Sequence, residues 1–583
     1  MKLTRIRSVS RLTLVALLVL ASGANARASN DPTVLGYALA ADVDTLDPHW
    51  AYDATSLFIV DQVYETLIDF AGESLDAFEP RIATVVPSLT NGFLSKDGLT
   101  YAFPLRSGVT FHDGTPMTTA DVKYSLMRFL LLDREGGPSN LLLKGLLGVH
   151  RTGDLPPDRI FDLADKAVSI EGGALVLRLN KPFAPLLSIL TNFAHIVPKD
   201  TITADGGWDG RKETWVRHRN PAKESATLYA RMNGTGPFQF ESWDRAAKTM
   251  TLVRNDHYWR KPAALAKVNL MIIADSHERQ RRLAQGEIDV AFVERRYLDQ
   301  FEGLPGVVVN DGLPALETQN AVLLNFKIEP KDNVWLGSGK LGDGVPPDFF
   351  ADAEVRKGFA FAFDYDAFIK EGYRSKAVQA HGPIPAVLFG YNPKQKPWPY
   401  SPYQAEGAFK RAQNGAVWSQ GFALSLAYTE GNAERRIACR LLKEGIEKLN
   451  AKFHVDCRAL PDSRLLNEFR ARRLPAFVYR WILDYPDPHN AVEPFLHSRG
   501  YFASTLGYAN ARADAMIEQA ASEADPAKRK ALYYELQALA IYDAPAIFTV
   551  DSHNIFVRSA KVQGWLYHPI QPYGTLYEVT KTP

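Results

Sequence analysis

The sequence predicts an α/β protein with at least one doubly wound lobe. Residues 422–426, 434–449 and 453–457 have the patterns of a strand, an amphipathic helix and a second strand. This βαβ unit implies a parallel sheet. A further helical stretch, residues 462–472, leads into a strand at residues 476–481. A ligand is expected at the carboxyl ends of such strands.

Short strands and helices alternate in the N-terminal part of the chain. Thr118 or Thr119 is a good N-cap, and Asp121 would lie favourably in the first turn of the helix that follows. Apolar residues at helical spacing predict an earlier helix over residues 56–67. Strands are expected at residues 33–37, 101–105 and 109–111, with a turn at residues 44–48.

Gly234 and Gly236 invite a phosphate-loop interpretation, because glycines let backbone N–H groups approach an anion. The segment lacks the Gly-Lys-Ser/Thr continuation and the following helix that such a loop requires. We therefore expect a tight turn that enters a hairpin. The hairpin strands would be residues 238–240 and 249–253, and further on the pattern predicts helices at 511–522 and 526–542 before a terminal β-rich stretch.

Composition excludes several classes of protein. The 583 residues correspond to roughly three or four domains at ~150 residues each. Charged residues make up 23% of the chain, as in globular proteins, and two cysteines exclude a disulfide scaffold or a Cys-rich metal module. Lys plus Arg total 67 against 66 for Asp plus Glu, which argues against a nucleic-acid or anionic-membrane partner.

The first 28 residues have the pattern of a secretory signal peptide. Four basic residues precede an apolar run at residues 12–21. Alanines at positions 24, 26 and 28 then provide the spacing of small residues at which a signal peptidase would cut, before Arg27 or Ser29. The run is too short for a membrane anchor. No cysteine follows the run, so there is no residue to carry a lipid. Without the four basic residues, the mature chain is mildly acidic. A periplasmic protein without a lipid anchor is expected.

Cys439 and Cys457 have two interpretations. They could form a disulfide in an oxidising compartment, or both could be small buried hydrophobic residues. No serine elbow, zinc-binding helix or dinucleotide fingerprint is present, and the scattered histidines favour neither a metal site nor any other cofactor. Asp484 and Asp487 could perform acid–base chemistry or recognise a cation.

One long motif and several short ones carry a family resemblance. Residues 97–116 (DGLTYAFPLRSGVTFHDGTP) and 120–125 (ADVKYS) strongly resemble the bacterial extracellular solute-binding proteins of the dipeptide- and oligopeptide-binding type. The resemblance extends over the mature chain. The supporting motifs, in order, are LDP at 46–48, YETLI at 64–68, GTGPF at 234–238, NDHYW at 255–259, GEID at 286–289, VRKGFAFAFD at 355–364 and YPDP at 485–488.

The resemblance implies a two-lobed periplasmic binding protein of the type II, large-cluster kind, with two hinge strands. The hinge strands would lie near residues 320–325 and 546–550, and an insert at residues 326–349 is expected to be a surface loop, with a role at the cleft left open. The implied divisions are a signal peptide at 1–28, a first lobe of 30–58, 191–318 and 546–583, an inserted small domain at 59–190 and a second lobe at 319–545.

The resemblance also implies a ligand site. Oligopeptide binders of the family place an Asp, which pairs with the peptide α-amino group, three residues after a Trp, and Trp481 and Asp484 match this spacing. Tyr485 is a further candidate. Asp42, Val43 and Asp44 lie where the family presents main-chain groups to peptide.

The implied function is peptide capture for the inner-membrane permease of an ABC importer, by a monomer without chemistry of its own. Another ligand, such as an oligosaccharide or an opine-like compound, is an alternative within the family. A secreted hydrolase that uses Asp484 and a second acid is the alternative outside it, and it would need two carboxylates ~5–9.5 Å apart.

Overall fold

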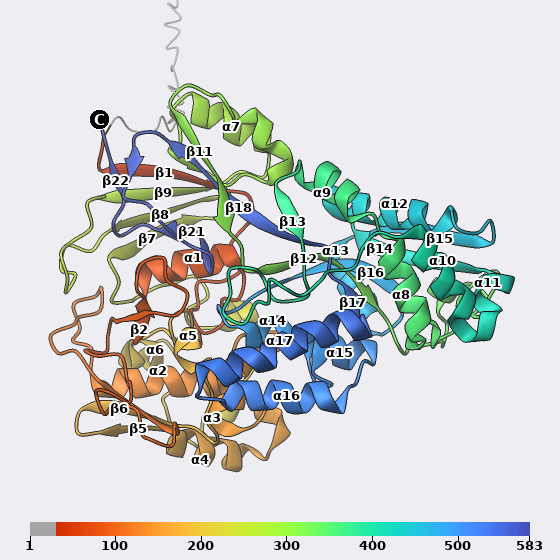
Figure 1. The fold of residues 1–583 in the computed structure, drawn as a ribbon. Helices are drawn as coiled ribbons and strands as arrows, with labels where there is room; N and C mark the ends of the chain where they lie inside the picture. Colours follow the sequence, from red (N-terminus) through yellow and green to blue (C-terminus); the bar gives the residue numbers. More distant parts are fainter. Residues whose placement is uncertain (1–30) are drawn as a thin grey trace, which may run out of the picture.

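The computed structural model describes residues 31–583, so the predicted signal peptide at 1–28 lies outside the described residues. Within the described range, no helix is both long and apolar enough to cross a bilayer. The chain forms two α/β lobes, which Figure 1 shows side by side.

The first lobe is built on a parallel core of three strands. The strand at Val34–Leu39 pairs in parallel with the strands at Lys267–Ile272 and Val290–Ala291, and an antiparallel hairpin extends the sheet. This hairpin confirms the strands predicted at residues 238–240 and 249–253. The elements are β1 (Val34–Leu39), α1 (Ala54–Val63), α6 (Lys199–Ala204), β7 (Phe238–Asp244), β8 (Thr249–Arg254), β9 (Lys267–Ile272), α7 (Ser276–Ala284), β10 (Val290–Ala291), β11 (Val307–Pro314), β19 (Val562–Gln563), β20 (Leu566–His568), β21 (Gln571–Thr575) and β22 (Thr580–Lys581).

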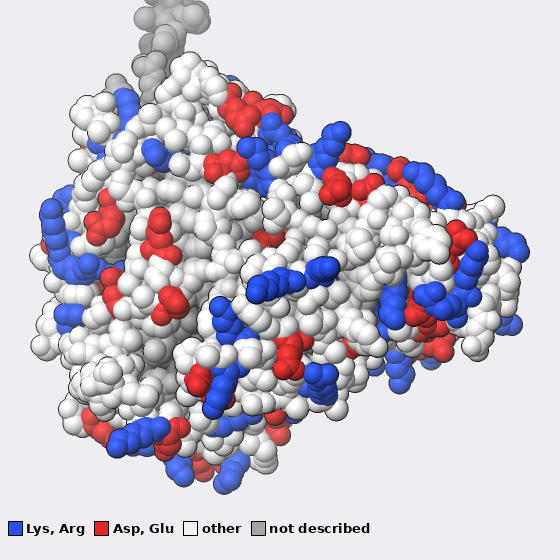
Figure 2. Space-filling model, in the orientation of Figure 1, with Lys and Arg blue, Asp and Glu red and all other residues white. Residues whose placement is uncertain are grey.

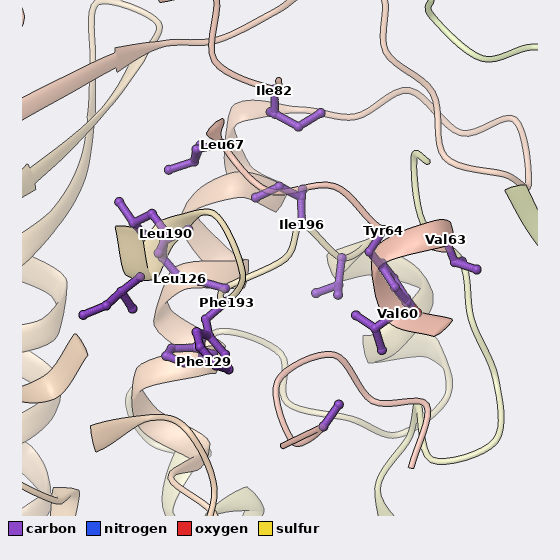
Figure 3. Packing of buried hydrophobic residues seen from close by; sticks show 14 of the residues in the cluster. Val60, Val63, Tyr64, Leu67, Ile82, Leu126, Phe129, Leu190, Phe193 and Ile196 are labelled. Atoms are coloured by element: carbon purple, nitrogen blue, oxygen red, sulfur yellow. The ribbon is translucent and has the colours of Figure 1, made fainter. Parts of the chain in front are cut away.

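The segment between α1 and residue 190 shares its core with the first lobe. Leu126 and Phe129 belong to the same buried cluster as Val60 and Ile196, and Figure 3 shows these side chains together. A small antiparallel sheet covers this core. The elements are β2 (Ile68–Phe70), β3 (Phe78–Pro80), β4 (Thr100–Pro104), α2 (Thr119–Leu132), α3 (Asn140–Leu147), α4 (Pro157–Ala167), β5 (Val168–Glu171), β6 (Ala174–Arg178) and α5 (Leu186–Leu190).

The strand predicted at residues 109–111 is reduced to a single antiparallel bridge, between Thr110 and Pro116. The strand predicted at residues 101–105 forms as β4 and pairs with β6. Val109 and Phe111 are buried, and two backbone bonds form this bridge: Phe111 N donates to Thr115 O at 2.8 Å and Met117 N donates to Val109 O at 2.9 Å. The apolar alternation therefore marks a short paired segment that turns back at residues 112–114 before a strand can form.

The second lobe contains the predicted βαβ unit. Its strands β14 and β15 are parallel and joined by α12, and β14 also pairs in parallel with β16. The elements are β12 (Glu317–Leu324), α8 (Ala353–Ala362), α9 (Tyr365–Tyr373), β13 (Ala377–Gln379), α10 (Pro402–Arg411), α11 (Ala416–Gln420), β14 (Phe422–Thr429), α12 (Ala433–Glu447), β15 (Phe453–Leu460), α13 (Asp462–Arg470), β16 (Ala476–Ile482), α14 (Pro488–Leu496), α15 (Tyr501–Leu506), α16 (Ala511–Ser522) and α17 (Pro526–Asp543).

Helices cover both faces of this sheet, so its strands alternate between two cores. Leu426 and Val478 pack in one core with residues of α8, α10 and α12. Their neighbours Ala427 and Phe477 pack in the other core, with residues of α13 to α17. Figure 1 shows α9 and α12 on one side of the sheet and α16 and α17 on the other. Burial on both faces makes the lobe doubly wound.

Strands near both predicted hinge segments join the two lobes. β12 pairs with β17 (Ala546–Ile547) through Val322 and Leu323, and with β18 (Val550–Ser559) at Gln319. β18 then continues into the first lobe and pairs with β10 and β11. One sheet of thirteen strands therefore runs through both lobes. The residue boundaries of the predicted domains stay a prediction.

The insert at residues 326–349 is not the expected surface loop. Leu336, Val345 and Phe349 are buried in the second-lobe core. Backbone bonds tie the insert to residues that precede β14 and β16: Gly342 N donates to Gly421 O, and Glu329 N donates to Arg472 O, each at 2.9 Å. These residues precede the strands, so the insert packs at the edge opposite their carboxyl ends.

The two cysteines form a disulfide that joins α12 to β15. Cys439 and Cys457 are 18 residues apart in the sequence. Cross-linking a loop of this length restricts the unfolded chain, which stabilises the folded state by about 3 kcal/mol. We expect the Cys439→Ala/Cys457→Ser variant to lose this amount, measured by urea unfolding. Dithiothreitol should destabilise the native protein and leave the variant unchanged; an equal effect on both would contradict the prediction.

Candidate functional site

The lobes meet where the parallel strands of each lobe end. In the first lobe, β1 and β10 end next to residues 40–47 and 292–295; in the second, β14 and β16 end next to residues 430–432 and 483–485. Direct contacts join the lobes. Arg296 Nη1 donates to Gly431 O at 2.7 Å, and Ala184 N donates to Ala521 O at 2.8 Å. This interlobe region is where an open α/β sheet places a ligand.

Asp484 lies in the interlobe region, directly after β16. Its Oδ2 accepts a hydrogen bond from Asn490 Nδ2 at 3.1 Å, and the hydroxyl of Tyr52, from the first lobe, also hydrogen-bonds to its carboxyl. Burial raises the pKa of Asp484 to about 6, although both hydrogen bonds oppose the shift. Among residues 31–583, no lysine, arginine or histidine contributes a neutralising charge. The part of the chain that the structure describes therefore leaves this carboxylate without a paired cation.

Trp481 and Tyr485 flank Asp484 in different ways. Trp481 is half-buried, and its Nε1 donates to Asn490 O at 3.0 Å, so only its ring surface is left for a ligand. Its ring centroid lies 5.6 Å from that of Tyr501. Tyr485 is buried in the same cluster as the first-lobe core, where it packs between the lobes.

The structure places Asp42, Val43 and Asp44 on the first-lobe loop after β1. Asp42 is exposed and accepts a hydrogen bond from Val43 N, and the Val43 side chain is buried. The Asp44 carboxylate pairs with Lys223 at 2.5 Å and with Arg134 at 3.4 Å. Asp44 is therefore already neutralised within its own lobe, unlike Asp484.

A buried ion pair fixes this loop. Arg128 of α2 donates to both carboxylate oxygens of Asp47, at 2.8 and 2.5 Å, and to His49 Nδ1 at 2.9 Å. Burial would raise the pKa of Asp47, but the charge and hydrogen bonds of Arg128 hold it below the ordinary value. The network connects α2 to the loop that carries Asp42, Val43 and Asp44.

Sequence reasoning missed four residues of the interlobe region: Tyr52, Asn490, Arg435 and Arg480. Arg435 is buried beneath Tyr479, 4.3 Å from the ring centroid, and donates to Asn320 Oδ1 at 3.3 Å. Arg480 is half-exposed and lies 3.4 Å from Glu317. Pro488 is a signal for the start of a helix and could have indicated that Asn490 lies in a first turn beside Asp484.

The second-lobe side of the site therefore carries both signs of charge. Asp484 follows β16, Arg480 lies within it, and Arg435 is close enough to Arg480 for their charges to interact. Such an arrangement suits a ligand with an ammonium and a carboxylate. Within residues 31–583, no group of three or more His, Cys, Asp or Glu side chains is placed to hold a metal ion.

Comparison with known proteins identifies the family. The curated relatives include a probable D,D-dipeptide-binding periplasmic protein, DdpA, of Escherichia coli, 23% identical over 97% of each chain. Heme-binding protein A of Haemophilus influenzae is 23% identical over 91% of this chain and 88% of that protein. Among solved structures, the periplasmic binding protein DppA of Helicobacter pylori, in complex with the peptide STSA, superposes with a TM-score of 0.71 at 22% identity, covering 94% of this chain and 98% of that chain.

A family model matches most of the chain, from residue 84 to residue 503, and includes all of α2 to α14. The chain belongs to the bacterial extracellular solute-binding proteins, family 5.

Proposed function

We propose that the protein captures peptides with a free α-amino group in the periplasm and delivers them to the inner-membrane permease of an ABC transporter. It acts as a monomer and without chemistry of its own. Asp484 receives the peptide ammonium, and the ring of Trp481 lies beside it. The main-chain groups of residues 42–44 line the first-lobe side of the ligand.

The observation that carries this proposal is the Asp484 carboxylate at the meeting of the lobes, to which no lysine, arginine or histidine of the described chain, residues 31–583, contributes a neutralising charge. A buried charge is costly unless it is paired and hydrogen-bonded. Asn490 and Tyr52 supply the hydrogen bonds, and a ligand ammonium supplies the charge. Arg480, which also pairs with Glu317 at 3.4 Å, offers a partner for the ligand's carboxylate.

Two relatives in the comparison are named for different ligands, a dipeptide and a heme, so membership of the family does not by itself specify a peptide. The proposal of a peptide ligand therefore rests on the residues of the site. Lys and Arg are interspersed with Asp and Glu on the face in Figure 2, so this face offers no extended positive patch for a polyanionic ligand. Mass spectrometry of what the native protein releases on denaturation tests the proposal. Peptides with free amino groups are expected; an oligosaccharide or a haem would contradict it.

The affinity for peptide should depend on pH through Asp484. Only its ionised form pairs with an ammonium, and its pKa is about 6. Affinity should therefore be constant above about pH 7 and fall about tenfold per unit well below pH 6. In the empty protein the sign is opposite: a raised carboxyl pKa disfavours the charged native form, so stability decreases as pH rises from about 4 to 6. Calorimetric titration between pH 4.5 and 7.5 measures the affinity, and Asp484→Asn should abolish this dependence.

A further inference from the structure

Asn490 connects the two residues that define the candidate amine site. Its Oδ1 accepts a hydrogen bond from Asp484 N at 2.7 Å, and its Nδ2 donates to Asp484 Oδ2 at 3.1 Å. Its main-chain oxygen accepts the indole N–H of Trp481 at 3.0 Å. Asn490 is only 5% exposed. A single buried residue therefore holds the backbone and carboxylate of Asp484 and the ring of Trp481.

These bonds are not explained by the needs of the helix. Asn490 lies in the first turn of α14, where an Asn often satisfies its own backbone. Here Asp487 already provides the N-cap and accepts from His489 N at 2.8 Å. The amide of Asn490 instead faces back toward the loop after β16.

The position of Asn490 is itself fixed by other helices. Asp487, the N-cap of α14, accepts two bonds from Arg529 Nη2 of α17, at 2.7 and 2.9 Å. Arg529 Nε also donates to Ala520 O of α16 at 2.9 Å. Three helices of the second lobe therefore define where the Asn490 amide lies.

We infer that Asn490 is a positioning residue for ligand capture, which holds Asp484 and Trp481 in one geometry so that the free acceptor positions of the carboxylate face the ligand ammonium. The inference rests on the proposed function. A carboxylate has about four acceptor positions, of which Asn490 takes one and the hydroxyl of Tyr52 another. The remaining positions are sufficient for an ammonium.

The groups around Asp484 determine what loss of the amide does. Tyr52 faces it from the first lobe, and the negative charge of Glu493, 3.6 Å from Lys144, acts on it from α14. The side chains of Asn490 and Tyr52 favour the ionised form, and Glu493 disfavours it. Removing the amide should therefore raise the pKa of Asp484 and leave the Tyr52 hydroxyl to hold its side chain.

The test compares Asn490→Ala with Asn510→Ala. Asn510 is the N-cap of α16 in the same lobe, so its loss destabilises a helix without touching the site. Trialanine and N-acetyl-trialanine are the probes, titrated by calorimetry. We expect Asn490→Ala to weaken trialanine binding about tenfold at pH 7.5, because it removes a hydrogen bond to a charged group, and more at lower pH. N-acetyl-trialanine binding should change little. Equal effects of Asn490→Ala and Asn510→Ala on trialanine would overturn the inference.

A second measurement needs no ligand. The pH dependence of unfolding is compared with and without Asp484→Asn, first in the native background and then in the Asn490→Ala background. The pH range over which ionisation of Asp484 lowers the free energy of unfolding should move to higher pH when Asn490 is lost. The inference would be overturned if this range stayed the same. If this shift occurs but the native protein binds neither trialanine nor any member of a peptide library, the proposed function is wrong, whereas the contact between Asn490 and Asp484 is supported. If Asn490→Ala does not fold, Asn490→Gln takes its place in both measurements. Asn490→Gln displaces the amide by one methylene, so the same effects are expected.

Discussion

Asp484→Asn should weaken the binding of a free-amine peptide by ~2–5 kcal/mol. This loss corresponds to an affinity about 30-fold to about 4,000-fold lower. The substitution keeps the shape of the side chain and the contact with Asn490, but it removes the charge that the ligand ammonium needs. The loss of binding free energy is expected to be large because Asp484 is half-buried and no lysine, arginine or histidine among residues 31–583 contributes a neutralising charge.

Asp42→Asn is the matched control for this variant. Asp42 is exposed on the opposite lobe, and its side chain is bonded to the main chain of Val43. The proposed contacts there use main-chain groups, so Asp42→Asn should bind peptide as the native protein does. Calorimetric titration measures both variants, and equal affinity of native protein and Asp484→Asn for a free-amine peptide would remove Asp484 from the site.

Arg128→Met should lower the free energy of unfolding by about 3–5 kcal/mol, because it leaves the Asp47 carboxylate buried without a cation. The side chains of Arg128 and Asp47 are 3% and 0% exposed. The pair holds the pKa of Asp47 below its ordinary value. The stability that the pair contributes is therefore complete above the ordinary pKa, and it is lost as the pH falls through the lowered pKa of the folded state.

Lys123→Met is the control on the same helix. Lys123 pairs with Asp165 at 2.6 Å, but the two side chains are 33% and 52% exposed. Water screens such a pair, so its loss should cost less than about 1 kcal/mol. Urea unfolding measures both variants. The account of the buried pair would be wrong if Arg128→Met and Lys123→Met were equally stable, or if Asp47→Asn/Arg128→Met were no more stable than Arg128→Met.

Elements with a clear periodicity could be predicted from the sequence. The βαβ unit of β14, α12 and β15 and the helix α16 follow from apolar spacing, which reflects burial on one or both faces. The same reasoning was right only in part at residues 109–111, where a single antiparallel bridge forms in place of a strand, because apolar alternation does not set the length of the pairing. It failed at residues 326–349, where many glycines concealed the buried Leu336, Val345 and Phe349.

The candidate site could be predicted only in part. The spacing of Trp481 and Asp484, which depends on residues close in sequence, predicted a site on the second lobe, and the structure places Asp484 beside Tyr52 of the first lobe. Tyr52 approaches Asp484 from the other lobe, and Asp44 pairs with Lys223, 179 residues away. Such contacts depend on the packing of distant segments, which periodicity and local motifs do not encode.

A thermal-shift screen of the native protein tests the central proposal most directly. A ligand that binds only the folded state adds about 2.7 kcal/mol of stability at about 100 times its dissociation constant. The screen compares free-amine di- to pentapeptides, the same peptides with acetylated amino groups, and a panel of oligosaccharides. We predict that free-amine peptides raise the melting temperature by several degrees and that acetylation removes most of the rise. A rise with oligosaccharides and none with any peptide would contradict the assignment of a peptide ligand.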